Sequence, residues 1–329
     1  MEELYKLNQL AAKIGSDPTL IQGAGGNVSL KVNNKFFVKA SGVWLSDALV
    51  KDIFVSMSLQ EAREGLSANQ LAEVKFDSIG GINNRPSIET SLHLLMPHRV
   101  VLHLHCVNTI SLAVRNNARD LLEDLLSDFQ WEFVPYVKPG EDLTRSVKEV
   151  LNKKSVNVLV LGNHGLVIGD DDVESADKLL KNVTHKLKQY NFSSLSINKN
   201  DLSFTDIPNG WRLPKYPEIQ ELAFDKERAE MVASGSLYPD HVVFLGKGVG
   251  LNGNHTKTKI GIPKVQIYKN KYVLVKDGLD AGAEEMVRAL ALIVFRIPLG
   301  SDIRYLTSEE EDELLDWDAE KYRQSLVKR

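Results

Sequence analysis

Two pairs of short apolar segments, each pair joined by a tight turn, constrain the fold of this chain more than any other feature. Residues 28–32 and 36–39 flank the turn at Asn33-Asn34, and residues 156–161 and 166–168 flank Gly162-Asn163-His164-Gly165. A tight turn can join only antiparallel strands, because a parallel connection needs a crossover of about a dozen residues or more. We therefore expect a mixed, mostly antiparallel sheet.

Segments with a helical pattern alternate with strand-like segments over the first two thirds of the chain. The expected helices cover residues 1–15, 46–53, 87–96, 120–129, 142–152 and 173–188, and further strands cover residues 54–57 and 100–105. A sheet between such helices buries both of its faces. The pattern predicts an α/β protein with a three-layer α/β/α sandwich.

The composition changes at residues 191–209, which are rich in Ser, Asn and Asp. We expect a boundary there, with a first domain over residues 1–195 and a small α+β extension over residues 196–329. The elements expected in the extension are helices over 216–233, 283–297 and 308–326, the last capped by Ser308, a strand over 241–245, and a hairpin of residues 265–268 and 272–275.

Composition excludes several classes of function. The 329 residues include 40 Lys and Arg against 44 Asp and Glu, a net charge of -4, so no nucleic-acid partner is expected. The longest apolar run, residues 289–295, is far shorter than the ~20 residues of a membrane helix, and residues 1–15 lack the features of a signal peptide. The single cysteine, Cys106, excludes an intrachain disulfide and a multi-cysteine metal site. We expect a cytoplasmic protein without membrane contact.

Two histidines share one face of an expected strand. In residues 100–105, alternation places His103 and His105 on one face and Leu102 and Leu104 on the other. Two neighbouring imidazoles can chelate a metal, and the alternative is a pair of structural histidines. Cys106 is expected on the opposite face, in the core.

Two further segments favour the metal site. His164 lies in the turn between two apolar strands, and Glu89 lies in the first turn of the helix that follows Pro86. The alternatives are a turn histidine held by hydrogen bonds and a carboxylate that only favours a helix N-terminus. Three histidines and one glutamate form a four-ligand set suited to Zn²⁺, or to another divalent metal.

A glycine-rich segment predicts an anion pocket beside the metal. Gly25, Gly26 and Asn27 precede a strand rather than a helix, so they form neither a dinucleotide fingerprint nor a P-loop, and a dehydrogenase is disfavoured. Backbone amides of such a turn can bind a phosphate or a carboxylate. The other candidate pocket residues are Lys39, Ser41, Gly42 and Ser87. The alternative is that these segments are ordinary turns.

The order of these motifs resembles the class II aldolase/adducin family. In chain order they are Gly-x-Gly-Gly-Asn-x-Ser, Ser-Gly, Pro-Ser-x-Glu, His-x-His and Asn-His-Gly, and the resemblance covers about residues 10–190. The best-known members are zinc-dependent fuculose-phosphate and rhamnulose-phosphate aldolases and ribulose-phosphate 4-epimerase. Tyr238-Pro239-Asp240-His241 and residues 317–322 resemble the aldolase half of proteins fused to a short-chain dehydrogenase. Because the sequence ends at Arg329, we expect no dehydrogenase here.

The resemblance implies a role for each matching residue. His103, His105 and His164 match the metal ligands, and Glu89 matches the residue that both contacts the metal and acts as general base. The residues that match the substrate phosphate pocket are Gly26, Asn27, Ser41, Gly42 and Ser87. The family also implies a homo-oligomer, usually a tetramer.

The chain departs from the family pattern at the pocket and at the proton donor. Residues 23–27 lack two hydroxyls of the typical Gly-Thr-Ser-Gly-Asn, Ile88 replaces a common serine, and Lys39 replaces a common threonine. The pocket is therefore expected to hold a carboxylate or a differently placed phosphate. The usual tyrosine after the His-x-His strand is missing, so Tyr136, Tyr238 or a water is the candidate proton donor.

Together the residues and the resemblance predict a zinc-dependent aldolase. It would cleave a ketose phosphate or a related sugar derivative through a metal-stabilised enediolate. An epimerase, decarboxylase or dehydratase acting on a sugar phosphate or sugar acid would use the same site. A non-catalytic, adducin-like binding scaffold is the alternative from another class.

Overall fold

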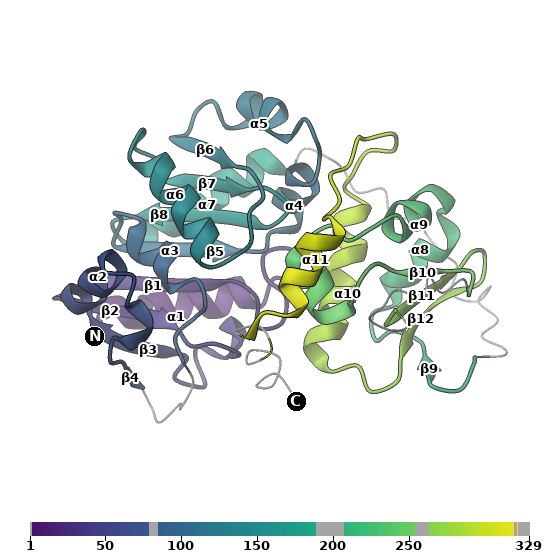
Figure 1. The fold of residues 1–329 in the computed structure, drawn as a ribbon, viewed down its shortest axis with the longest axis horizontal. Coiled ribbons are helices and arrows are strands. Elements are labelled where there is room, and N and C mark those ends of the chain that lie inside the picture. The colour runs from purple at the N-terminus through teal and green to yellow at the C-terminus, as the bar shows by residue number, and fades with distance from the viewer. Residues whose placement is uncertain (1, 79–84, 189–206, 254–262, 319–320, 322–329) are drawn as a thin grey trace.

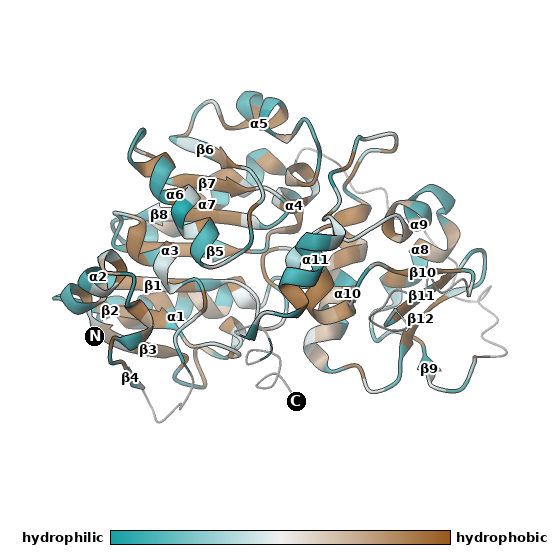
Figure 2. Cartoon of the chain, in the orientation of Figure 1, coloured by the Kyte–Doolittle hydropathy of each residue, from teal (hydrophilic) through white to brown (hydrophobic). Residues whose placement is uncertain are grey.

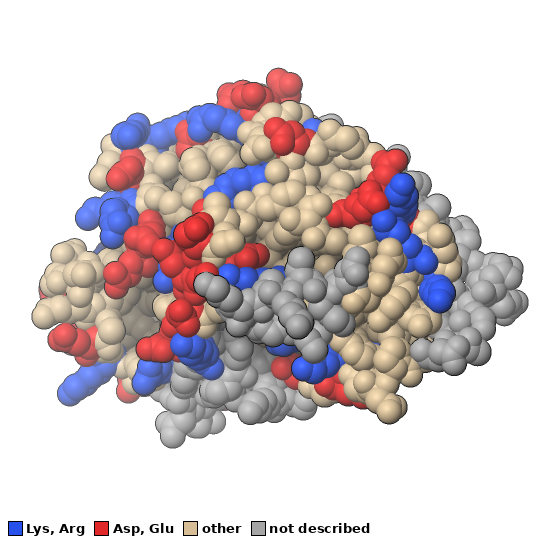
Figure 3. Space-filling model, turned by 45° about the vertical axis from the view of Figure 1, so that its right-hand side comes forward, with Lys and Arg blue, Asp and Glu red and all other residues tan. Residues whose placement is uncertain are grey.

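The computed structural model describes residues 2–78, 85–188, 207–253, 263–318 and 321. The boundary expected at residue 195 lies outside these ranges, so the division into two domains stays a prediction. Of the helices in the described ranges, none is both long enough and apolar enough to cross a lipid bilayer. Basic and acidic side chains are interspersed over the face drawn in Figure 3, and the expected lack of a nucleic-acid partner stays a prediction.

A mixed sheet forms the centre of the N-terminal part (Figure 1). The order is β4-β3-β2-β1-β5-β8-β7-β6, and each neighbouring pair of these described strands is antiparallel except β6 and β7. The strands are β1 (Asn27–Val32), β2 (Lys35–Lys39), β3 (Phe54–Ser58), β4 (Asp77–Ser78), β5 (Val100–Leu104), β6 (Trp131–Val134), β7 (Val158–Leu161) and β8 (Gly165–Asp170). The expected mostly antiparallel sheet is therefore confirmed.

The β1–β2 hairpin follows directly from its turn residues. Val32 pairs with Lys35, and between them Asn33 and Asn34 have φ angles of 49° and 57°. Two successive residues in the left-handed region give the turn whose twist matches an antiparallel pair of strands. Asparagine tolerates this region because its short polar side chain can hydrogen-bond locally.

Helices cover both faces of the sheet, which confirms the three layers. On one face α1, α4, α5 and α7 bury Leu30, Leu102 and Ile168, and on the other α2, α3 and α6 cover Val38 and Val101. Figure 2 shows β5 and β7 between them as predominantly hydrophobic. The helices are α1 (Glu2–Gly15), α2 (Leu59–Ser67), α3 (Thr90–Leu95), α4 (Val107–Ala113), α5 (Ala118–Leu126), α6 (Glu141–Leu151) and α7 (Val173–Leu187), with 3₁₀ turns η1 (Leu45–Asp47) and η2 (Leu71–Glu73).

The C-terminal part forms a second, smaller sheet in the order β10-β11-β12-β9, in which β11 and β12 are the expected hairpin. Its elements are β9 (Trp211–Arg212), η4 (Pro217–Gln220), α8 (Glu221–Phe224), α9 (Lys226–Ala233), η5 (His241–Leu245), β10 (Gly250–Leu251), β11 (Val265–Tyr268), β12 (Tyr272–Lys276), α10 (Ala281–Val294) and α11 (Ser308–Leu315). The buried helix α10 packs against α4, and Val107, Ile110 and Val114 belong to the same hydrophobic cluster as α10. The core of the extension is therefore continuous with the N-terminal part.

Two elements of the C-terminal part differ from expectation. Residues 241–245 form the π-helix η5 rather than a strand. The prediction failed because every residue of this short apolar run is buried, so the run shows no periodicity that would distinguish a helix from a strand. The helix expected over 216–233 breaks at Asp225. The Asp225 side chain accepts a hydrogen bond from the backbone N–H of Arg228 and so starts α9 as a separate helix.

The ends of two other helices were also predicted wrongly. Thr307, not Ser308, caps α11 through a capping box with Glu310, and α11 ends at Leu315; the expected end at 326 lies outside the described residues. The helix expected over 46–53, for which Ser46 is the sequence's cap candidate, is only the turn η1, and its N-cap is Trp44. Residues 49–52 are exposed, 49 and 50 at 58% and 79%, so little apolar burial stabilises a longer helix there. The other expected elements agree with the structure to within about one helical turn.

Candidate metal centre

His103 and His105 lie at the C-terminal end of β5, on the side that strand alternation predicts. Leu102 packs in the layer of α1 and α7, whereas Val101 belongs to the hydrophobic cluster on the opposite face of the sheet. By strand alternation His103 lies on the same face as Val101. His105 follows directly after the strand, and the two imidazole centroids are 5.1 Å apart. Cys106 is fully buried in the α1 and α7 layer, as expected of a core residue.

The β7–β8 turn brings His164 to the same place. Asn163 has a φ of 50°, which turns the chain back sharply and leaves His164 at the tip. A Cβ on Gly165 would lie 2.3 Å from the carbonyl oxygen of Leu104, so a glycine here lets β8 approach the end of β5. The His164 ring centroid is consequently 4.9 Å from that of His103 and 5.2 Å from that of His105.

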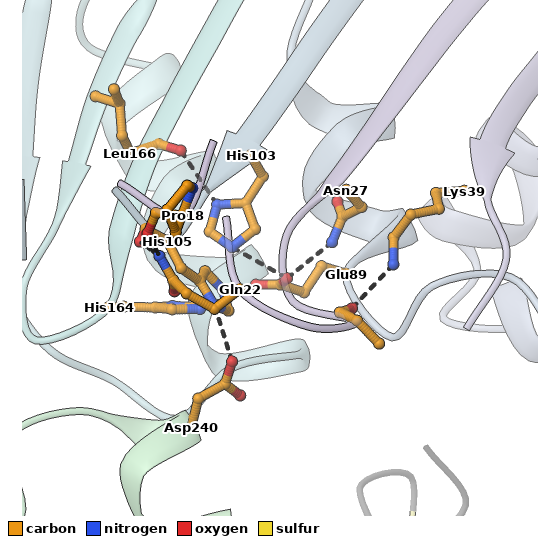
Figure 4. Close-up of polar contacts among 11 residues, drawn as sticks. Pro18, Gln22, Asn27, Lys39, Glu89, His103, His105, His164, Leu166 and Asp240 are labelled. Carbon is orange, nitrogen blue, oxygen red and sulfur yellow. Dashed lines mark hydrogen bonds and ion pairs between the residues drawn. The ribbon is translucent and has the colours of Figure 1, made fainter. Parts of the chain in front are cut away.

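Glu89 reaches the histidines from the start of α3. It is the N-cap residue, one position before the first turn where it was expected, and the Ser87 hydroxyl accepts a hydrogen bond from its backbone N–H at 3.3 Å. Glu89 Oε2 lies 3.2 Å from His103 Nε2, and Glu89 Oε1 lies 3.6 Å from His164 Nε2. Figure 4 shows this carboxylate and the imidazoles pointing toward one another.

These four side chains fit a divalent metal ion. One ligand atom from each of Glu89, His103, His105 and His164 lies within 4.8 Å of the others, and all four residues are buried. Within the described residues, Glu89 Oε1, His103 Nε2 and His105 Nε2 are buried atoms without a hydrogen-bond partner. An unsatisfied buried polar atom costs about 1–3 kcal/mol, and coordination of a metal removes that cost. Three imidazoles and a carboxylate are also a ligand set that Zn²⁺ accepts.

The electrostatics of the cluster favour the protonation states that metal ligands need. Burial alone would raise the pKa of Glu89, but the facing imidazoles of His103 and His164 outweigh it and hold that pKa well below its usual range. Burial lowers the pKa of His164 to about 3. An ionised carboxylate and a neutral imidazole both offer a lone pair to a cation.

Asp240 also reaches this cluster, from the C-terminal extension. Its Oδ2 lies 2.9 Å from His105 Nδ1, and it is 4% exposed. Sequence reasoning assigned it no role, since the only signal was its place in the segment 238–241 that resembles fused aldolases. In the same cluster, His103 Nδ1 lies 3.3 Å from the carbonyl oxygen of Leu166.

The glycine segment expected to bind an anion packs directly against the histidines. The N–H of Gly25 donates to the carbonyl oxygen of Gln22 at 3.0 Å. Gly26 has a φ of 56°, and a Cβ there would lie 2.7 Å from the carbonyl oxygen of His103. The Asn27 amide donates to Glu89 Oε2 at 3.1 Å. The structure therefore brings these three residues to the cluster, and their contact with a substrate anion stays a prediction.

The remaining pocket candidates lie on two adjoining segments. Ala40 and Pro86 form a β-bridge, and the N–H of Ser87 donates to the carbonyl oxygen of Lys39 at 3.0 Å. The Lys39 amine, in a side chain that is 2% exposed, donates to the carbonyl oxygens of Ala24 at 2.9 Å and Val43 at 2.8 Å. Lys39 thus ties the glycine segment to the neighbouring loop, which contains Ser41 and Gly42.

The two tyrosines considered as proton donors, Tyr136 and Tyr238, pack in or against the hydrophobic cluster of the extension. Tyr136 stacks under the Arg304 guanidinium, 4.7 Å from its ring centroid, and Tyr238 is buried in the core of the extension. Burial raises the pKa of both phenols. A role for either in proton transfer stays a prediction.

Comparison with known proteins agrees with the resemblance found in the motifs. The family model described as "Class II Aldolase and Adducin N-terminal domain" matches residues 5–190, and the chain belongs to this family. Two curated relatives are an uncharacterized oxidoreductase, YuxG, of Bacillus subtilis and an L-fuculose phosphate aldolase of Methanocaldococcus jannaschii. YuxG is 30% identical over 207 residues, which are 58% of this chain and 29% of YuxG. The aldolase is 25% identical over 171 residues, which are 50% of this chain and 82% of the aldolase.

Among solved structures, the N-terminal class II aldolase domain of a conserved protein from Thermoplasma acidophilum is 26% identical. The match covers 56% of this chain and 90% of that domain, with a TM-score of 0.46. This chain therefore spans less than a third of YuxG but most of the shorter relatives.

Proposed function

We propose that this protein is a divalent-metal-dependent lyase of the class II aldolase type, acting on a sugar phosphate or a sugar acid. His103, His105 and His164 hold the metal, and Glu89 is both a ligand and the general base. Zn²⁺ is the metal proposed for this site. The observation that carries the proposal is the buried set of four ligand atoms within 4.8 Å of one another. Membership of the family and the similarity to a fuculose phosphate aldolase support the reaction type.

The metal would supply Lewis acidity, which stabilises the negative charge that develops on a carbonyl oxygen when the neighbouring carbon–carbon bond breaks. Three neutral imidazoles cancel none of the cation's charge and the Glu89 carboxylate cancels only part of it, which favours this role. The chain's own part is to hold these imidazoles in a buried site, where electrostatic interactions are stronger than in water.

Glu89 moves the proton. In the condensation direction its carboxylate removes the proton next to the carbonyl, and in the cleavage direction it returns that proton to carbon. The Asn27 amide, which donates to Oε2 at 3.1 Å, fixes the orientation of the carboxylate. Oε1, which has no hydrogen-bond partner among the described residues, is the oxygen open to the metal, and it would accept the proton only while it is released from the metal.

The anion pocket supplies substrate binding. Ser41, Gly42 and Ser87 lie on the two adjoining segments beside the glycine segment of Gly25 and Gly26. Backbone and hydroxyl donors there would bind a phosphate or carboxylate, and Lys39 holds the glycine segment in place. The homo-oligomer, the tetramer in particular, and the cytoplasmic location remain part of this proposal.

A panel of sugar phosphates and sugar acids tests the proposal. Incubated with protein loaded with Zn²⁺, at least one member should yield two carbonyl-containing fragments, detected by NMR. Chelation should abolish the cleavage and added metal should restore it. Cleavage that survives complete removal of metal would contradict the metal's role. Interconversion of stereoisomers without fragments would replace the lyase by an epimerase, and loss of CO₂ or water would identify a decarboxylase or a dehydratase.

A further inference from the structure

The C-terminal extension reaches the candidate metal centre through the Asp240 carboxylate. Asp240 is the N-cap residue of η5 and lies far from β5 in sequence, yet its Oδ2 is 2.9 Å from His105 Nδ1 (Figure 4). Both side chains are at least nine-tenths buried. This distance places a buried carboxylate within hydrogen-bonding reach of the ring nitrogen.

The contact determines which ring nitrogen faces the cluster. A carboxylate oxygen only accepts hydrogen bonds, so a neutral His105 imidazole can donate to Asp240 only with its proton on Nδ1. His105 Nε2 then presents its lone pair, and this buried atom has no hydrogen-bond partner among the described residues. Carboxylates that accept from the outer nitrogen of a metal-binding histidine orient the ring and raise its basicity.

The surroundings leave this pair little freedom. A Cβ on Gly25 would lie 2.9 Å from His105 Nδ1 and 3.3 Å from Asp240 Oδ2, so the backbone of the glycine segment packs against both partners. The Gln22 amide donates to the backbone carbonyl oxygen of His105 at 3.3 Å. The ring is therefore held from its backbone side as well as from Nδ1.

The extension also holds the turn that carries His164. The Asn163 amide donates to the carbonyl oxygens of Leu237 at 2.9 Å and Arg304 at 2.7 Å, both in the extension. Two of the three histidines are thus positioned by residues beyond the segment that the family model matches.

We infer that Asp240 is a positioning residue for the metal centre, and that the extension completes the centre by setting the tautomer and orientation of His105. This inference rests on the proposed metal site. It assigns the extension a direct part in the chemistry of the N-terminal part.

Metal affinity and ring protonation in the full chain test the inference. Asp240→Ala should weaken Zn²⁺ binding by about 10–100-fold, measured by competition with a chromophoric chelator. In the metal-free protein, ¹⁵N NMR should show His105 protonated at Nδ1 in the wild type and no longer held in that form in the variant. Asp240→Asn keeps the shape and one acceptor oxygen, so its affinity should lie between the two. Asp316→Asn, which removes a carboxylate that is 90% exposed, is the matched control and should bind as the wild type does.

The possible failures can be told apart. Unchanged affinity and an unchanged His105 tautomer in Asp240→Ala would overturn the inference. If Asp240→Ala does not fold, the same two measurements on Asp240→Asn decide it, and wild-type values there would overturn it. Failure of the wild type itself to bind any divalent metal would instead overturn the proposed function, while the tautomer in metal-free protein would still test the contact.

Discussion

At the scale of single residues, Gly25 shows how a missing side chain makes room for the site. We predict that Gly25→Ala lowers stability by about 1–3 kcal/mol, because the new Cβ would lie 2.9 Å from His105 Nδ1 and 3.0 Å from the carbonyl oxygen of Gln22. The displaced imidazole should also bind metal more weakly. Chemical denaturation and a metal-competition titration measure the two effects.

Gly278→Ala is the control for this prediction. Gly278 has a φ of 79° and no atom within 4 Å of a built Cβ, so the alanine there meets only backbone strain of about 1 kcal/mol. Metal affinity should be unaffected. If the two variants bind metal equally well, close packing of Gly25 is not what positions His105.

A substitution of Glu89 can distinguish its proposed role as general base from its proposed role as metal ligand. Glu89→Gln nearly preserves the shape of the side chain but removes its basicity, so turnover of the identified substrate should fall by about 10²–10⁴-fold. The fold and most of the bound metal should be retained. Circular dichroism, metal analysis and steady-state kinetics on one preparation test all three expectations.

The exposed Glu64→Gln, on α2, is the control and should behave as the wild type does. Wild-type turnover in Glu89→Gln would show that this carboxylate is not the base. Complete loss of metal would show that its role as a ligand dominates.

At the scale of secondary-structure elements, two adjacent residues, Thr307 and Ser308, are candidates for the N-cap of α11. The Thr307 side chain accepts from the backbone N–H of Glu310, and the Glu310 carboxylate accepts from the N–H of Thr307. Thr307→Ala should therefore lower stability by about 0.5–2 kcal/mol. Ser308→Ala, which removes the hydroxyl that the sequence pattern favoured, should change stability by much less. Equal losses in urea denaturation would contradict the assigned cap.

The elements also show what the sequence alone can predict. The turn at Asn33-Asn34 predicts its hairpin correctly, because both the turn residues and the alternation of the strands carry the signal locally. Residues 241–245 carry no such signal, since every side chain of this run is buried and a helix and a strand then look alike. Caps fail by a residue or two because neighbouring polar residues compete, and tertiary packing decides between them.

At the scale of the whole molecule, the extension and the N-terminal part share a hydrophobic core and a buried polar bridge. Asn163→Gly keeps the left-handed backbone at φ 50° but removes the donors to Leu237 and Arg304. We predict a loss of about 1–3 kcal/mol, because one buried and one part-buried carbonyl oxygen lose their partner. The two parts should also unfold less cooperatively, which differential scanning calorimetry would detect.

Asn33→Gly is the matched control for this bridge. Asn33 has a φ of 49° but is exposed in the β1–β2 turn, so the same substitution removes no bridge between the two parts. Its stability should stay within about 0.5 kcal/mol of the wild type. Equal effects at the two positions would mean that the amide of Asn163 does not link the two parts.

The candidate site was predictable from the sequence only in part, for reasons of distance along the chain. His103 and His105 share a strand face by local geometry, and the family pattern adds Glu89 and His164. Asp240 lies in a segment that resembles fused aldolases, but nothing local linked it to the site, because it approaches the site only after the extension packs against α4 through a shared core. Contacts made by tertiary packing between remote segments need the structure.

Metal analysis of the purified protein tests the central claim most directly. Wild-type protein reconstituted with Zn²⁺ and freed of excess should carry about one ion per chain, the stoichiometry of a single four-ligand site. His103→Ala combined with His105→Ala should carry none. His185→Ala, which removes a histidine on α7 away from the cluster, should bind as the wild type does. Equal metal content in the wild type and the double variant would contradict the metal centre on which the account depends.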